Sequence, residues 1–344
     1  MNEQKPKANG LRIDIHSHVL PPAWPDFNER FGVSGFPTLE QEDGRTIIKR
    51  HGKFFREVWL NITDIELRIA QYSKHGVSVQ VISTVPVMFS YDQHAEHALA
   101  MSQVLNDHVA EEQAARPRQV IALGTVPMQD ADTAISELRR LKEELNVPGI
   151  QIGSNVNQKN LGDEEFFPIF EAAADLGLAI LVHPWQMMGQ ADMQKYWLPW
   201  LVGMPAEVSR AICSMIFAGV LERLPALRVC FGHGGGAFPF TIGRIEHGFN
   251  MRPDLVAVDN PVNPREYLDR IWVDSVTHDP KALRYLLDVM GERRVIFGTD
   301  YPFPLGEQKP GEVAAQLDLP EETLRALFAD NALEWLGLDK QDYL

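Results

Sequence analysis

Two histidines separated by one residue, His16 and His18, close the apolar segment 11–18. In a β-strand, residues two apart point to the same face, so these two imidazoles project side by side from one strand end. Each imidazole carries a ring nitrogen that needs a partner, which makes the pair unfavourable inside an apolar core. The same geometry suits two metal ligands. The sequence therefore predicts half of a metal site here, with a pair of surface histidines as the alternative.

Three later apolar segments end in ligand-type residues, namely His183, His233 and Asp300. Nitrogen and oxygen ligands without thiolate are typical of Zn²⁺, with cobalt, iron or manganese as substitutes. We predict one metal ion per chain, bound by His16, His18, His183 and Asp300. Three imidazoles and one carboxylate leave a position for water, and a metal lowers the pKa of such a water towards neutrality.

His233 stands outside this predicted ligand set, within the glycine-rich stretch 232–236. Glycines let the backbone approach a ligand closely, and an unperturbed imidazole titrates near neutral pH. We therefore predict that His233 is a general acid/base, and that Asp300 is catalytic as well as a metal ligand. A structural role is the alternative for each strand-end histidine alone. Four histidines and an aspartate at equivalent positions argue against it.

Eight nearly continuous apolar segments alternate with helical segments. Continuous apolar runs suit strands that are buried on both faces, and strand–helix alternation indicates a parallel sheet. Eight repeats favour a closed (β/α)8 TIM barrel, in which catalytic groups lie at the carboxyl ends of the strands. A doubly wound open sheet is the alternative, but no Gly-x-Gly-x-x-Gly follows the first strand. The predicted strands are 11–18, 77–85, 120–126, 149–153, 178–183, 228–233, 271–276 and 295–300.

We expect residues 1–10 to form a flexible tail and residues 11–344 to form a single barrel domain. Segment 21–59 interrupts the alternation directly after the first strand. Turn signals at 43–44 and 51–52, each an X-Gly pair beside strand-like residues, indicate a small β insertion. It is either a hairpin or a three-stranded flap.

Composition excludes several classes of partner. The formal net charge is −15, with 47 acidic and 32 basic side chains, so the chain repels phosphate backbones and nucleic acid is not expected. No run of about 18 apolar residues occurs, so no membrane association is expected. The two cysteines give neither a metal-binding spacing nor a disulfide framework, which indicates a reducing, cytoplasmic location.

The arrangement of ligand-type residues resembles the amidohydrolase superfamily: His-x-His on the first strand, histidines after the fifth and sixth, and aspartate after the eighth. A lysine after the fourth strand, which often bridges two metals there, is absent from 151–155 (QIGSN), so a mononuclear site is expected. Two further stretches, 195–206 (KYWLPWLVGMPA) and 298–306 (GTDYPFPLG), are more specific. They resemble a decarboxylase branch of the superfamily.

This resemblance implies a zinc-dependent, non-oxidative and non-hydrolytic decarboxylase. Its substrate would be a small acyclic dicarboxylate that bears an enamine and an aldehyde. Arginine pairs bidentately with carboxylate, and the resemblance implies such a role for Arg56 of the insertion. It also implies a homodimer in which Arg244 and Arg252 reach the neighbouring subunit's site. The implied pocket walls are Met187, Trp200 and Phe303.

Other readings of the same residues stay open at this point. The arginines could be solvated surface charges, and the pocket walls could be ordinary apolar packing. The site could also serve a hydroxybenzoate decarboxylase or a hydrolase of amide, lactone or ester bonds. A non-catalytic protein with a structural metal is a further reading, although such sites are often thiolate-rich. Within the decarboxylase reading, either hydroxide addition or protonation comes first.

Overall fold

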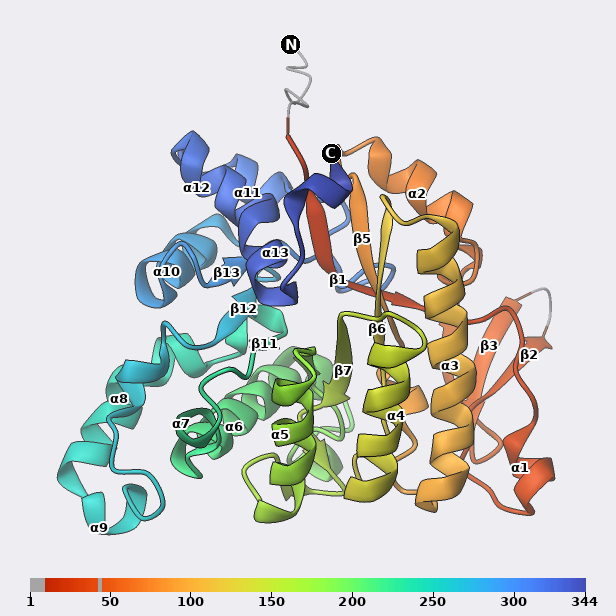
Figure 1. Ribbon diagram of the computed structural model, residues 1–344, viewed down its shortest axis with the longest axis horizontal. Coiled ribbons are helices and arrows are strands. Elements are labelled where there is room, and N and C mark those ends of the chain that lie inside the picture. The colour runs from red at the N-terminus through yellow and green to blue at the C-terminus, as the bar shows by residue number, and fades with distance from the viewer. Residues whose placement is uncertain (1–9, 43–44) are drawn as a thin grey trace.

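The computed structural model describes residues 10–42 and 45–344, and eight parallel strands form its centre (Figure 1). The strands are hydrogen-bonded in chain order, and each pair is parallel. Their bounds are β1 Ile13–Val19, β5 Val79–Thr84, β6 Val120–Gly124, β7 Gly149–Gly153, β10 Ala179–His183, β11 Val229–Phe231, β12 Trp272–Asp274 and β13 Val295–Ile296.

Backbone hydrogen bonds between β1 and the segment that follows β13 close the sheet. The amide of Ile15 donates to the carbonyl of Phe297 at 3.0 Å, and the amide of Asp300 donates to the carbonyl of His16 at 2.8 Å. The predicted (β/α)8 TIM barrel is therefore confirmed. The second bond also has a local consequence, because it places the Asp300 backbone directly beside a predicted metal ligand.

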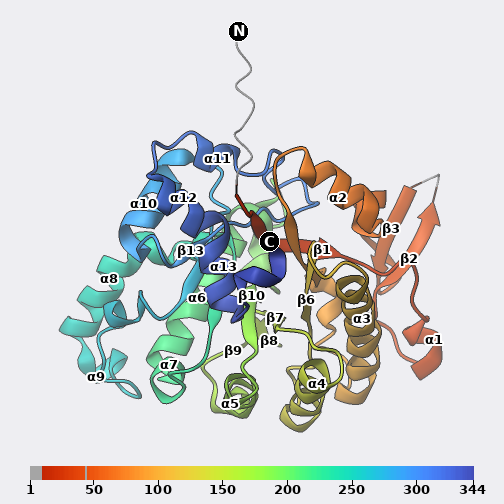
Figure 2. The same ribbon diagram turned by 45° about the horizontal axis from the view of Figure 1, so that its top comes forward.

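Helices surround the barrel, as the two views in Figures 1 and 2 show. None of the helices in the described part of the chain has the length and apolar character that a membrane crossing requires. The α-helices are α1 Phe27–Phe31, α2 Ile65–Ser73, α3 Ala95–Ala115, α4 Ala131–Glu143, α5 Phe167–Asp175, α6 Met204–Phe217, α7 Val220–Arg223, α8 Phe238–Met251, α9 Pro253–Val256, α10 Pro280–Met290, α11 Glu312–Ala315, α12 Glu321–Arg325 and α13 Asn331–Leu336.

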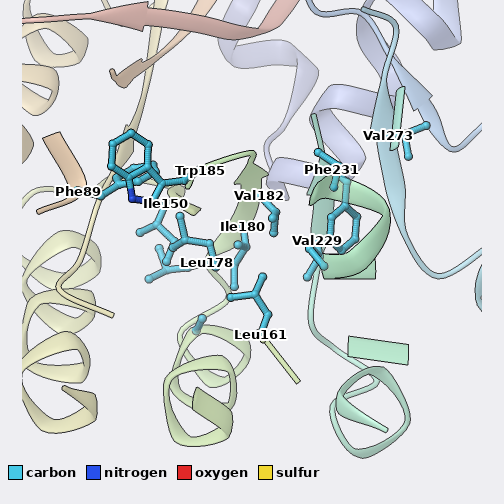
Figure 3. Close-up of a cluster of buried hydrophobic side chains, with 14 of the residues drawn as sticks. Phe89, Ile150, Leu161, Leu178, Ile180, Val182, Trp185, Val229, Phe231 and Val273 are labelled. Carbon is cyan, nitrogen blue, oxygen red and sulfur yellow. The ribbon is translucent and has the colours of Figure 1, made fainter. Parts of the chain in front are cut away.

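The core has two layers because side chains alternate along each strand. On β10, Ile180 and Val182 belong to the cluster between strands and helices, part of which Figure 3 shows. Leu181, between them, belongs instead to the barrel interior, where the buried Trp335 of α13 also packs. Both faces of β10 are thus apolar, which explains the continuous apolar run in its sequence.

The insertion contains a three-stranded antiparallel sheet, as predicted, of β2 Thr38–Glu42, β3 Arg45–Arg50 and β4 Lys53–Val58. His51 and Gly52 have φ of 51° and 67°, the left-handed backbone that a two-residue hairpin turn requires. The turn predicted at 43–44 lies outside the described residues, as does the predicted tail except for Gly10. The short helix α1 was not predicted.

The last two strands are shorter than predicted. The sequence predicts strands over 271–276 and 295–300, whereas the ladders of β12 and β13 stop at Asp274 and Ile296. Beyond β13 the backbone leaves the extended conformation, and Asp300 has a φ of 59°. This departure turns the carboxylate of Asp300 towards β1 instead of continuing the strand.

Candidate metal centre and active site

The four predicted ligands converge at the carboxyl ends of their strands. His16 and His18 project from β1, His183 ends β10, and Asp300 follows β13. One ligand atom from each lies within 4.8 Å of the others, and all four residues are buried. The barrel thus gathers residues that are up to 284 positions apart, since 300 − 16 = 284.

Backbone carbonyls fix two of the three imidazoles. Nδ1 of His18 donates to the carbonyl of Thr84 at 2.9 Å, and Nδ1 of His183 donates to the carbonyl of Pro184 at 2.9 Å. A carbonyl oxygen only accepts hydrogen bonds, so each Nδ1 carries the hydrogen. The lone pair of each neutral ring therefore lies on Nε2, the atom that faces the other ligands.

Asp274 fixes the third imidazole, and the sequence analysis missed it. Its Oδ2 accepts a hydrogen bond from Nδ1 of His16 at 2.6 Å and another from the amide of His233 at 2.9 Å. Its Oδ1 accepts from the amide of Gly234 at 2.8 Å. This fully buried carboxylate thus joins a metal ligand to the segment that carries the predicted acid/base. The available signal was an acidic residue at the end of the seventh apolar segment.

The electrostatic environment favours metal-binding forms at two ligands. Burial lowers the pKa of His183 well below its ordinary value, and neighbouring imidazoles lower it further. Burial acts to raise the pKa of Asp300, but the nearby imidazoles, His18 among them, outweigh burial and hold this pKa well below its ordinary value. At neutral pH His183 is therefore neutral and Asp300 is ionised, as metal ligation requires.

His16 behaves differently because it faces two carboxylates. Burial alone would lower its pKa, but the hydrogen bond to Asp274 and the charges of Asp300 and Asp274 raise the pKa to about 9. A proton therefore competes with a metal ion for this ring. The excess of carboxylate charge around His16 is suited to a bound cation.

The residues present fit a single metal ion. The Nε2 atoms of His16 and His183 are buried and have no hydrogen-bond partner among residues 10–42 and 45–344. Nε2 of His18 lies 3.2 Å from Oδ1 of Asp300. Buried polar atoms without partners are rare in native proteins, and a metal ion would satisfy these lone pairs. Three imidazoles and one carboxylate are a donor set that Zn²⁺, iron, cobalt and manganese accept.

A cavity of about 260 Å³ opens beside the metal ligands. The guanidinium of Arg56 lies 4.2 Å from the centre of the Phe303 ring and 5.9 Å from that of Trp200. The insertion thus places a cation over two aromatic faces inside the cavity. Lining residues from the predicted set are His183, Asp300, Arg56, Met187, Trp200 and Phe303.

His233 is placed beside the ligands but outside their group. Its ring centre lies 5.1 Å from that of His16 and 5.3 Å from that of His183. The residue is half-buried, and burial lowers the pKa of its imidazole. It lines a second cavity of about 560 Å³, which shares Trp200 and Met204 with the first. The imidazole therefore stands in the wall between the metal ligands and a second space.

Close contacts explain why glycine occupies the positions around His233. A side chain at Gly236, whose φ is 64°, would lie 2.1 Å from the carbonyl oxygen of Pro205. A side chain at Gly232 would lie 3.2 Å from Cε1 of His16. Only glycine allows the backbone to pass this close to the ligand ring and to the start of α6.

The other two predicted arginines lie on the surface of the chain. Arg244, on α8, is exposed. Arg252 follows α8 with its side chain 59% exposed, and it pairs with Asp254 through two hydrogen bonds of 2.8 and 2.7 Å. Neither residue lines the cavity of its own chain. Their action in a neighbouring subunit stays a prediction.

Fold and site together define a class: a (β/α)8 barrel that carries one three-histidine, one-aspartate metal centre at its strand ends. The family model described as amidohydrolase matches residues 13–338. The chain belongs to the amidohydrolase family.

Comparisons with known proteins extend this assignment. The chain is 54% identical over 336 residues to the 2-amino-3-carboxymuconate-6-semialdehyde decarboxylase of Dictyostelium discoideum, covering 97% of this chain and 94% of that protein. It is 36% identical to the protein of the same name from Caenorhabditis elegans, covering 97% and 96%. Among solved structures, 5-carboxyvanillate decarboxylase from Sphingomonas paucimobilis is 27% identical with a TM-score of 0.75, covering 81% and 84%.

Proposed function

We propose that this chain is a metal-dependent, non-oxidative decarboxylase that converts 2-amino-3-carboxymuconate 6-semialdehyde to 2-aminomuconate 6-semialdehyde. The reaction belongs to 3-hydroxyanthranilate breakdown in the tryptophan–kynurenine route. The observation that carries the proposal is 54% identity to a decarboxylase of that name across 97% of the chain. The complete metal centre beside a cation-lined cavity supports it.

The reaction needs a carboxylate to leave as CO₂ while the electron pair of the broken carbon–carbon bond stays on the substrate. A proton takes the place of the carboxylate, so each turnover consumes one proton. When bound, the metal supplies a Lewis acid that stabilises negative charge as it develops. Arg56 binds a substrate carboxylate, and the Phe303 face holds its guanidinium in place.

His233 holds and moves the proton in this proposal. Its ring lies about 5 Å from two ligand rings, which supports a place beside a substrate at the metal centre. Asp274 orients it by accepting its backbone amide, and the same carboxylate holds His16. One buried side chain therefore keeps the acid/base and the metal centre in a fixed relation.

We propose zinc as the metal, one ion per chain, with cobalt, iron or manganese as possible substitutes. The absence of thiolate and the predominance of imidazole among the four ligands support zinc. Metal analysis of protein purified without added metal tests this choice. Zinc at one equivalent per chain is expected, and another metal at one equivalent would replace zinc in the proposal.

We also propose a homodimer whose subunits share arginines. Exposed apolar side chains lie on α8 and in the segment after it, namely Phe240, Met251, Leu255 and Val258. Arg244 lies on the same helix and does not line the cavity of its own chain. An apolar face of this kind suits contact with a second copy.

Subunit mixing tests the shared arginines directly. Arg56→Ala and Arg244→Ala variants are each expected to be impaired. If Arg244 acts across the interface, a mixed dimer has one site with both changes and one site with neither. Mixing is therefore expected to give each hybrid dimer one intact site, and so about half the activity of the unaltered dimer. No restoration, with hybrid formation verified, would place Arg244 in its own subunit's site.

A cytoplasmic location is part of the proposal. Cys213 and Cys230 are both free thiols, which supports a reducing compartment. Cell fractionation with an antibody against the chain tests this. Recovery in the soluble cytoplasmic fraction is expected, and recovery in an organelle lumen would contradict it.

The function is tested with substrate generated freshly from 3-hydroxyanthranilate. Metal-loaded protein is expected to bleach the substrate chromophore faster than spontaneous cyclisation, with one CO₂ per molecule consumed. A chelator is expected to abolish the reaction, and added metal to restore it. No acceleration by fully loaded dimer would reject this substrate. Hydroxybenzoate decarboxylation would then be assayed on the same preparation.

A further inference from the structure

A second arginine of the insertion, Arg50, lines the same cavity as Arg56. Arg50 ends β3, and Ile48 on that strand pairs with Arg56 of β4. The register of the β3–β4 pair shifts between Ile48 and Lys49, and Arg50 lies beyond this shift. The hairpin brings both arginines to the lining of the same cavity.

The guanidinium of Arg50 is held on two sides. Its Nε donates to the carbonyl of Gly35 at 3.1 Å, and its Nη2 donates to Oδ1 of Asp92 at 2.5 Å. Its centre lies 5.6 Å from the Trp185 ring centre, and the side chain is only 16% exposed. Nη1 makes no hydrogen bond to any residue of 10–42 or 45–344. The side chain is therefore oriented while part of its donor capacity stays free.

The two arginines contact different aromatic walls of the cavity. Arg50 lies over Trp185, which follows the ligand His183 by two positions. Arg56 lies over Phe303, which belongs to the loop after β13. A ligand in the cavity therefore meets one guanidinium beside each of two aromatic walls. Such an arrangement complements an anion with two separated negative groups.

Asp92 offsets part of the charge of Arg50 but does not use all of its donors. A guanidinium has five N–H donors in a fixed fork, and the two hydrogen bonds described above occupy two of them. A half-buried side chain that is already oriented loses little entropy when its remaining donors bind a carboxylate.

We infer that Arg50 is a specificity-determining residue that binds the second carboxylate of the substrate, the one that Arg56 does not hold. The inference rests on the proposed function for the identity of the substrate. It adds an arginine of the insertion to the carboxylate contacts proposed for Arg56 and for Arg244 across the dimer. Arg50 binds rather than reacts, so it acts on affinity and selectivity.

Equilibrium binding of two probes tests the inference without turnover. The probes are benzene-1,3-dicarboxylate and benzoate, measured by calorimetry on metal-loaded protein. The unaltered chain is expected to bind the dicarboxylate more tightly. Arg50→Gln is expected to reduce this preference about tenfold, the size of one charge-assisted contact, while benzoate binding stays unchanged. Arg50→Lys, which keeps the charge, is expected to be intermediate.

A matched control lies on the same strand. Arg45 begins β3, its side chain is 50% exposed, and it pairs with Glu57 on the hairpin itself. Arg45→Gln is expected to leave both affinities unchanged. Thermal unfolding and metal content are measured for every variant, so that a loosened insertion is recognised.

Three results would overturn the inference: no preference in the unaltered chain, no change on Arg50→Gln, or an equal loss for both probes. The last would mean that Arg50 only ties the insertion to Asp92. Failure of the proposed function can be distinguished from failure of this inference. A chain that kept an Arg50-dependent preference but did not decarboxylate the named substrate would contradict only that function.

Discussion

The metal end of the cavity and its rim are built in different ways. The four ligands come from or directly follow barrel strands, are at most 4% exposed, and accept or donate short hydrogen bonds to buried groups. The rim comes from the insertion and from the loops after β10 and β13. The barrel strands thus position the metal ligands, whereas the insertion and the longer loops supply the walls around them.

Part of the rim has an irregular backbone. The loop between β10 and α6 contains a short 3₁₀ turn at Gln190–Asp192 and a π-helical turn at Pro199–Gly203. Tyr196 and Trp197 within it have φ of 59° and 57°. Side chains of such a segment follow its particular sequence rather than a repeating pattern.

The largest expected effect comes from removing a ligand at the metal end. His183→Ala is expected to weaken metal binding and to reduce turnover to the uncatalysed rate, because the site loses one of its three imidazole ligands. Metal content and CO₂ release measure this. His75→Ala, a histidine outside the site, is the control. Retention of one tightly bound metal with normal turnover would remove His183 from the ligand set.

Removing the acid/base separates chemistry from metal binding at the same end. His233→Ala is expected to keep one metal per chain and to lower kcat about 10²–10⁴-fold, the usual contribution of a positioned acid/base. Metal analysis and steady-state kinetics measure the two effects. Near-normal kcat in the metal-loaded variant would show that His233 does not handle the proton.

A substitution of Asp274 tests whether its hydrogen bond to His16 is needed to orient this metal ligand. Asp274→Asn is expected to weaken metal affinity or activity about 10–100-fold, because a neutral amide replaces the carboxylate that fixes His16. Competition with a chromogenic chelator measures the affinity. Unchanged affinity and unchanged kcat would mean that backbone packing alone orients the ligand.

A substitution at the rim is expected to have the smallest effect, and mainly on substrate binding. Arg56→Lys keeps a charge but loses the planar fork over Phe303. KM is expected to rise about tenfold, with metal content unchanged and kcat changed less. Loss of metal from this variant would contradict the claim that the rim does not contribute to metal binding.

The sequence predicted most of the metal end because each ligand closes an apolar run. Strands buried on both faces leave their polar residues at the ends, so His16, His183 and Asp300 stand out from their surroundings. Asp274 closes such a run as well, but its role depends on His16, 258 positions away. No local pattern reports that contact.

The rim was less accessible to prediction. Arg56 entered only through the resemblance, and Arg50 was not predicted, since an arginine on a hairpin usually indicates a solvated surface. Its burial depends on Trp185 and Asp92, which the sequence does not place beside it. Arg244 and Arg252 depend on a second chain, so the geometry of one chain leaves their role a prediction.

Stepwise metal titration of the apoprotein tests the central claim most directly, with CO₂ release measured after each addition of zinc. The account predicts no release above background without metal, a linear rise, and a plateau at one metal per chain. The His233→Ala variant is predicted to bind the same single equivalent and release almost no CO₂. Full activity in metal-free protein, or a plateau at two metals per chain, would contradict the account.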